Sequence, residues 1–279
     1  MGRAGFTLIE TIVAMLLSSV VIILVSGTFL VQNQYYSAQT LNVSVHENAR
    51  VATERVAAEV RTAMEDGFVV AGARTLTLRS PVVLGAVCDR AGNDVRVHIE
   101  GGVAGLDTDE IAGLALRDPV AGTWEYQNAS WSSVNGGSVG SASACAANGA
   151  DTTSAFGEFH TILGVGTMFA SVPDEGDVLM FFRQTTFRIR PSVLDTMTLG
   201  LFRQVYGESS VEFATGMDTT AQFQYRTGGT TYADTVVGSG VGNIDAVRIV
   251  ADARLPARTG TQADATFGWS VNVAVRNVP

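Results

Sequence analysis

The sequence predicts an α+β protein, in which a long N-terminal helix is followed by a β-rich antiparallel globular head. Three observations support this prediction. Residues 6–31 form a largely apolar run with one charge, Glu10. A helical pattern of small and apolar residues continues to about residue 66, and no proline occurs before Pro81. Beyond Gly67 the pattern changes to an alternation of apolar and polar residues, which is typical of strands.

The apolar run at residues 6–31 is long enough to cross a membrane as a helix, which needs about 20 residues. A secretory signal peptide would have a shorter apolar core, with its cleavage site after that core. Glu10 is unusual, because a charged side chain in the bilayer costs roughly 2.5 kcal/mol or more unless it finds a partner. An ordinary anchor that tolerates this glutamate near the interface is the simple alternative. Gly27 is either a glycine that a membrane helix tolerates or a soft point at which the helix can stretch.

Residues 32–66 are expected to continue the helix as an amphipathic segment outside the membrane. The small and apolar stripe consists of Leu41, Val45, Ala49, Ala52, Val56, Val60 and Ala63. The charged residues that we expect to cover the rest of the helix are Glu47, Arg50, Glu54, Arg55, Glu59, Arg61 and Glu65. The i,i+4 spacing predicts the pairs Arg50–Glu54, Arg55–Glu59 and Arg61–Glu65. Asp66-Gly67 is expected to end the helix, because glycine suits the position after a helix end.

Residues 67–279 are predicted to form one β-rich head. Strands are predicted at residues 75–78, 95–99, 178–182, 187–190 and 267–275. The dipeptides Gly92-Asn93 and Gly228-Gly229 are typical of the turns between strands. The segment near 128–157 is rich in Ser, Gly, Ala and Asn, which predicts a long surface loop or a flexible insertion.

The first ten residues carry a resemblance to a known family. The sequence Gly5-Phe6-Thr7-Leu8-Ile9-Glu10, followed by a long apolar run, resembles the type IV prepilin signature. The resemblance implies that residues 1–5 are a leader, that a membrane peptidase cuts between Gly5 and Phe6, and that Phe6 is then N-methylated. It also implies that Glu10 accepts the positive N-terminus of a neighbouring subunit in an assembly salt bridge. A buried carboxylate is destabilising alone and acceptable when paired, which agrees with that role.

Later segments are similar to PilW-type minor pilins and to J-type minor pseudopilins of type II secretion. These segments are Glu47–Arg50, Val56–Arg61, Gly176–Leu179, Gly200–Arg203, Phe223–Tyr225 and Ile244–Arg248. The resemblance implies a structural minor pilin that joins other minor pilins, primes type IV pilus assembly and lies near the tip. Its implied partners are the other minor pilins, the major pilin, prepilin peptidase and the inner-membrane assembly platform. Before assembly it would lie in the inner membrane with a cytoplasmic N-terminus, as Arg3 also suggests.

Other functions remain open at the sequence level. They are a J-type minor pseudopilin of a secretion system, a minor subunit of a DNA-uptake pilus, and a membrane-anchored adhesin or binding domain. With a net charge of −9, the chain is a poor general binder of nucleic acid. All 18 basic residues are arginine, and the group Arg183, Arg188, Arg190 and Arg203 is expected to lie on solvated strand faces rather than in a binding patch.

The sequence indicates neither an enzyme nor a cofactor or metal site. Two cysteines and three scattered histidines provide no metal-ligand spacing, and no nucleophile motif accompanies His46, His98 or His160. The acidic run at 107–110 lacks the full calcium-loop pattern, so we expect a solvated turn. Cys88 and Cys145 are predicted to form a disulfide in an extracytoplasmic head, and two free buried thiols are the alternative.

Overall fold

The computed structural model describes residues 7–64, 66–100, 102–104, 106–118, 122–138, 157–255 and 265–275. The chain divides into two compact units, Met1–Asn48 and Ala49–Pro279. The described part of the first unit is helical, and the second unit holds the last turns of that helix and the β-rich head. The predicted α+β class, a long N-terminal helix followed by an antiparallel head, is confirmed.

Helix α1 covers Leu8–Thr62 without interruption. It continues through Gly27, and no proline interrupts it. The helix ends four residues before the predicted boundary. Asp66, not the glycine, adopts the left-handed conformation, with φ of 53°. Gly67 is required for a different reason, since a Cβ there would lie 2.7 Å from the Met64 carbonyl oxygen and 3.0 Å from that of Arg79.

The described strands of the head form one sheet, in which every pairing is antiparallel. The strands are β1 (Phe68–Gly72), β2 (Thr75–Ala91), β3 (Asp94–Glu100), β4 (Ile111–Arg117), β5 (Trp124–Asn128), β6 (Asn135–Ser138), β7 (Gly157–Ile162), β8 (Val178–Pro191), β9 (Leu199–Val205), β10 (Val211–Met217), β11 (Gln222–Arg226), β12 (Ala246–Leu255) and β13 (Ala265–Ala274). The main order is β11-β12-β10-β9-β8-β2-β3-β7-β6, with β1, β4, β5 and β13 paired off this path. All five predicted strand segments fall within these elements, apart from Val275.

Two long strands, β2 and β8, connect two parts of the head, because each contributes side chains to two separate hydrophobic cores. The first core includes Leu78 of β2 and Phe187 of β8, and it contains the buried stripe of α1. The second includes Val87 of β2 and Phe181 of β8, and it contains no residue of α1. The β2–β8 register shifts between Pro81 and Val83, between these two groups of residues, which is a position where a strand tolerates proline.

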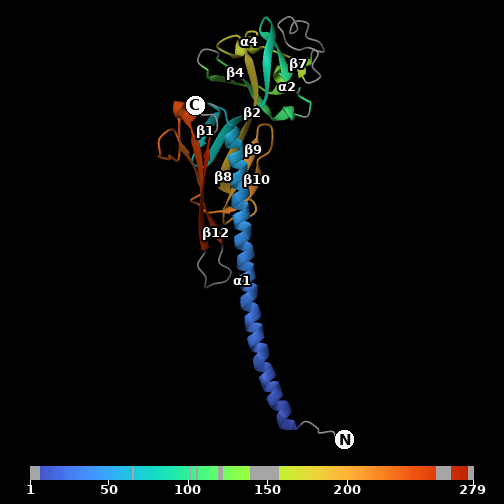
Figure 1. The fold of residues 1–279 in the computed structure, drawn as a ribbon, viewed down its shortest axis with the longest axis vertical. Coiled ribbons are helices and arrows are strands. Elements are labelled where there is room, and N and C mark those ends of the chain that lie inside the picture. The colour runs from blue at the N-terminus through green and yellow to red at the C-terminus, as the bar shows by residue number, and fades with distance from the viewer. Residues whose placement is uncertain are drawn as a thin grey trace. The chain divides into compact units, whose positions relative to one another are not determined.

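Figure 1 shows this division within the head. The labels β4, β7, α2 and α4 gather at one end, whereas β8, β9, β10 and β12 lie beside the last turns of α1. The first core is therefore a sheet closed over a helix, and we call it the helix core. The second is closed by strands and by the short helices α2 (Trp131–Val134) and α4 (Val165–Met168), and we call it the distal core.

The prediction of a loop or flexible insertion near 128–157 is wrong for its first part. Residues Trp131–Val134 form α2 and Asn135–Ser138 form β6. Trp131 and Val134 are buried in the distal core, so two apolar side chains among small polar residues are enough to fix this segment. Residues 139–156 lie outside the described part of the chain.

Candidate functional site

The first turn of α1 is closed by a reciprocal pair of side chains, Thr7 and Glu10. The Thr7 amide and the Thr7 hydroxyl both donate to Glu10 Oε2, each at 2.9 Å. The Glu10 amide donates to Thr7 Oγ1 at 3.4 Å. This arrangement is a capping box, in which a Thr and a Glu three residues apart satisfy the free N–H groups of a helix start. The spacing Thr-x-x-Glu was available in the sequence, but the cap was not predicted.

Glu10 is exposed, and both hydrogen bonds from Thr7 go to a single carboxylate oxygen, Oε2. The carboxylate is thus held at the start of α1 by its own chain. Its other oxygen, Oε1, accepts neither of the two hydrogen bonds from Thr7. This geometry leaves room for a donor from another molecule. Gly5 and Phe6 lie outside the described residues, so cleavage between them, methylation of Phe6 and the Glu10 salt bridge stay predictions.

The segment Leu8–Tyr36 of α1 is apolar on every side and is long enough to cross a membrane. None of its most apolar stretch is buried against the rest of the chain. Leucine, isoleucine and valine side chains are exposed along its whole length, from Leu8 to Val31. A soluble surface rarely exposes such a large continuous apolar area, so this segment is an interaction or membrane surface.

The last turns of α1 contain a second glutamate in the opposite environment. Glu59 is 3% exposed, and two arginines of the sheet reach it. Arg203 Nη2 of β9 lies 2.9 Å from Glu59 Oε1, and Arg183 Nη2 of β8 lies 3.2 Å from Oε2. The Ser80 hydroxyl of β2 also donates to Oε2, at 3.4 Å. This cluster, Glu59 with Arg183, Arg203 and Ser80, connects the helix to three strands of the head.

Two charge predictions are therefore corrected. Glu59 does not lie on a solvated helix face, and its ion pairs are made with Arg183 and Arg203 instead of Arg55. The predicted pair Arg50–Glu54 is confirmed, because Arg50 Nε lies 2.7 Å from Glu54 Oε1. The predicted pair Arg61–Glu65 stays a prediction, because Glu65 lies outside the described residues.

The four arginines of the sheet also make more contacts within the head than predicted. Arg183 also reaches Glu110 Oε2 at 3.4 Å, and Arg190 lies over the ring of the buried Phe202, with its Cζ 3.9 Å from the centroid. Arg188 and Arg190 are both exposed, as predicted, with exposed hydrogen bonds to Gln204 and Ser210. Arg183 and Arg203 are partly buried and contact Glu59.

The predicted disulfide is only partly within the described structure. Cys88 is disulfide-bonded and nearly buried on β2. Cys145, the other cysteine of the sequence, lies outside the described residues. The pairing of Cys88 with Cys145 therefore stays a prediction.

The histidines on strands have structural surroundings. His160 of β7 is buried, with Nε2 3.1 Å from Glu158 Oε2 and Nδ1 3.3 Å from Asn135 Oδ1. The Val103 amide donates to Glu158 at 3.2 Å, and this bond, with the one from His160, lowers the pKa of the Glu158 carboxyl. His98 stacks on Phe159, with ring centroids 4.7 Å apart. Neither histidine is paired with a serine or cysteine nucleophile in these contacts.

The acidic run at 107–110 forms a capped turn. Asp107 Oδ1 accepts from the Asp109 amide at 3.1 Å at the start of the short helix η1 (Thr108–Glu110), and Glu110 binds Arg183. Within the described residues, no three His, Cys, Asp or Glu side chains are grouped in a way that could hold a metal ion.

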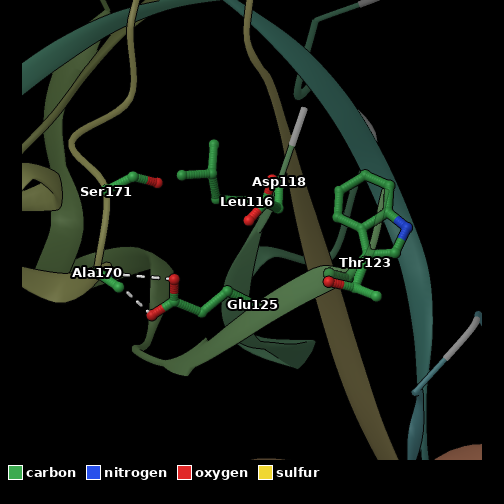
Figure 2. Close-up of a pocket in the computed structure, with 7 residues that line it drawn as sticks. Leu116, Asp118, Thr123, Glu125, Ala170 and Ser171 are labelled. Carbon is green, nitrogen blue, oxygen red and sulfur yellow. Dashed lines mark hydrogen bonds between the residues drawn. The ribbon is translucent and has the colours of Figure 1, made fainter. Parts of the chain in front are cut away.

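Figure 2 shows a pocket of about 440 Å³ beside β4 and β5. Its lining residues are Leu116, Asp118, Thr123, Trp124, Glu125, Ala170 and Ser171. The Glu125 carboxylate is turned to the Ala170 amide, which donates to both oxygens at 3.1 and 3.2 Å. The other polar residues of the described lining are Asp118, Thr123 and Ser171.

Comparison with known proteins adds one positive finding. Residues 1–26 match the family model described as the Prokaryotic N-terminal methylation motif. The chain has a prepilin-type N-terminus. The match covers the predicted cleavage and methylation positions, Gly5 and Phe6, together with Glu10 and most of the apolar segment, and it supports a structural subunit of the pilin or pseudopilin type. It also agrees with an inner-membrane anchor before assembly and with processing by prepilin peptidase. No curated protein and no solved structure matches the chain.

Proposed function

We propose that this chain is a structural minor pilin of the PilW type, which joins other minor pilins to prime type IV pilus assembly and lies near the pilus tip. The observation that carries the proposal is the start of α1, where the prepilin motif, an exposed Glu10 and an uncovered apolar helix coincide. The exposed apolar side chains of such a helix need lipid or another subunit to cover them.

In the proposed cycle the membrane stores the subunit with its head outside the cytoplasm. Prepilin peptidase cuts after Gly5 and methylates Phe6, and the assembly platform brings the subunit to other minor pilins and the major pilin. The methylated amine of a neighbouring Phe6 then donates to Glu10. An ion pair that forms only between subunits favours assembly, since an unpaired carboxylate in hydrocarbon is costly. No catalytic step by this chain is part of the proposal.

The decisive experiment is to co-express the full chain with an active prepilin peptidase and to measure the intact mass and the N-terminal peptide. We expect the mature chain to begin with N-methyl-Phe6. Retention of residues 1–5 in the presence of active peptidase would refute the proposal.

Co-purification then identifies the assembly. Recovery of minor pilins and the major pilin supports the pilus role. Recovery of secretion pseudopilins identifies a J-type pseudopilin, and recovery with a DNA-uptake apparatus identifies a subunit of that pilus. A processed chain that binds no pilin-like protein would favour an anchored adhesin or binding domain.

A further inference from the structure

The sheet that covers the helix core has a second face, which lies opposite the last turns of α1. Side chains alternate between the two faces along a strand, and Phe187 and Ile189 of β8 are buried in the helix core. Arg188 and Arg190 are exposed and therefore lie on the second face, which we call the arginine face. From the strand register, its positions on β2, β8 and β9 are Thr75, Thr77, Arg79, Gln184, Thr186, Arg188, Arg190, Gly200, Phe202 and Gln204.

The positions of the arginine face include three arginines and no acidic residue. This composition is unusual in a chain whose 27 acidic residues outnumber its 18 basic ones. On the other face of the same strands, the charges of Arg183 and Arg203 are compensated by Glu59. The neighbouring strand β10 brings Glu212 beside the arginine face, and its Oε2 accepts from the Val193 amide at 2.9 Å.

None of the three arginines forms a salt bridge with another residue that the structure describes. The hydrogen bonds of Arg188 and Arg190 go to neutral oxygens, Gln204 Oε1 at 3.4 Å and Ser210 Oγ at 3.5 Å. Arg79 Nε is buried and has no hydrogen-bond partner within the described part of the chain. Burial lowers the pKa of the Arg79 guanidinium, because the charged form is disfavoured away from water. The arginine face therefore carries positive charge that the described residues do not neutralise.

Aromatic rings hold two of these guanidinium groups in position. Arg79 Cζ lies 4.6 Å from the ring centroid of Tyr126 and 5.2 Å from that of Phe182. Arg190 lies over the buried ring of Phe202, as described above. A guanidinium that already rests on a ring loses less conformational freedom when it binds an anion, so the entropic cost of binding is smaller.

Strand geometry sets the spacing of the three charges. Arg188 and Arg190 are two positions apart on β8, or about 7 Å, and Arg79 lies opposite Gln184, about 13 Å from Arg188 along the strands. An extended peptide presents the side chains of one side at the same interval of about 7 Å. We propose that the arginine face binds an extended acidic segment of a neighbouring subunit, whose carboxylates pair with Arg79, Arg188 and Arg190. That the partner is a subunit of the same filament rests on the proposed function.

Protein carboxylates suit this face better than the backbone of a nucleic acid does. Guanidinium groups bind carboxylates and phosphates alike. However, duplex DNA carries one negative charge per about 1.7 Å of its axis, and the net charge of −9 opposes its approach to this chain. An acidic segment instead brings a few carboxylates among neutral residues, at the interval of the arginines.

The test measures the binding of fluorescein-labelled probes to the purified full chain in a zwitterionic detergent, by fluorescence anisotropy at low ionic strength. The main probe is a short peptide in which Glu alternates with Thr. One comparison peptide has Gln in place of Glu, and another has the same number of Glu residues at every third position. A thymidine oligonucleotide with the same number of charges is the last probe. The matched control variant is Arg90→Gln, because Arg90 is also exposed but pairs with Asp174.

We expect the alternating peptide to bind more tightly than the other three probes. Arg188→Gln and Arg190→Gln should each weaken its binding by about fivefold, the upper end for an exposed ion pair, and Arg90→Gln should leave it unchanged. Arg79→Gln should weaken binding at least as much, because Arg79 is less exposed. Both Arg188 and Arg190 are exposed, so their substitutions are expected to preserve the fold, which circular dichroism checks.

Wild-type affinity of the Arg188→Gln/Arg190→Gln double variant for the alternating peptide would overturn the proposal. Equal binding of the Gln peptide, or of the peptide with Glu at every third position, would overturn it as well. Tighter binding of the oligonucleotide would also overturn it and would assign the arginine face to nucleic acid. The assay needs neither prepilin peptidase nor other pilins, so a negative result leaves the proposed function standing. A failure of N-terminal processing would likewise leave the binding result unchanged.

Discussion

The two ends of α1 have opposite surroundings. In Leu8–Tyr36 the apolar side chains point in all directions and none is buried in the chain. In the last turns, Ala52, Val56 and Val60 are fully buried in the helix core. The two segments differ in how their apolar residues are spaced and in how large those residues are. Small residues on one stripe let a sheet approach closely, whereas a helix that is apolar all round can be covered only from several sides. The N-terminal segment therefore depends on lipid or on other subunits, and the C-terminal segment depends on its own head.

The two glutamates of α1 repeat this contrast. Glu59 is buried and finds Arg183 and Arg203 in the same chain. Glu10 is exposed, and among the described residues its carboxylate accepts hydrogen bonds from Thr7. Glu59 thus stabilises the fold, and under the proposed function Glu10 is held in place for a partner. The substitutions below test these two roles and the packing of the helix.

The largest stability effect is expected at Glu59. Replacing Glu59 by Ala removes the carboxylate that Arg203 contacts and leaves Arg183 with Glu110, and breaking a buried pair in this way costs up to roughly 3–5 kcal/mol. The matched control is Glu54→Ala, since Glu54 is exposed and pairs only with Arg50 within the helix. Such a surface pair contributes roughly 0.2–0.5 kcal/mol. Denaturant unfolding of the full chain in detergent measures both variants, and equal losses would contradict the assigned role of the Glu59 cluster.

A smaller loss is expected for the apolar stripe. Val56→Ala removes buried methyl groups from the helix core and should cost about 2 kcal/mol. Val51 lies five positions earlier and is largely exposed, so Val51→Ala should change the stability by less than about 0.5 kcal/mol. The same unfolding measurement compares them. Equal destabilisation by Val51→Ala and Val56→Ala would contradict the assignment of Val56 to the buried face of α1 and of Val51 to the exposed face.

The smallest effect is expected at the helix start. Thr7→Ala removes the side-chain half of the capping box and should cost about 1 kcal/mol of local helix stability. Amide hydrogen exchange in micelles should show faster exchange for the first turn of α1 and no change in the head. Unchanged protection of the first turn would show that the Thr7 and Glu10 bonds do not stabilise the helix.

The sequence predicted features that depend on local pattern. The length of α1, the strand segments and the change of period after Gly67 all follow from the spacing of apolar residues. It did not predict the environment of Glu59, because an i,i+4 arginine on the helix offered a local partner while the real ones come from β8 and β9, 124 and 144 positions away. It also missed α2, which is too short for a periodic signal and is fixed by the burial of Trp131 and Val134.

The central claim is that Glu10 is held by its own helix for use by another subunit. The most direct measurement is the co-purification of pilin partners with Glu10→Val protein, in cells that carry only that allele. Thr7→Ala is the matched control, because it weakens the same cap but keeps the carboxylate. We predict that Glu10→Val inserts in the membrane and is cleaved but loses its partners and reduces the number of filaments, whereas Thr7→Ala retains both. If the two variants behave alike, or if Glu10→Val assembles as the wild type does, Glu10 acts only as a helix cap and the account is wrong.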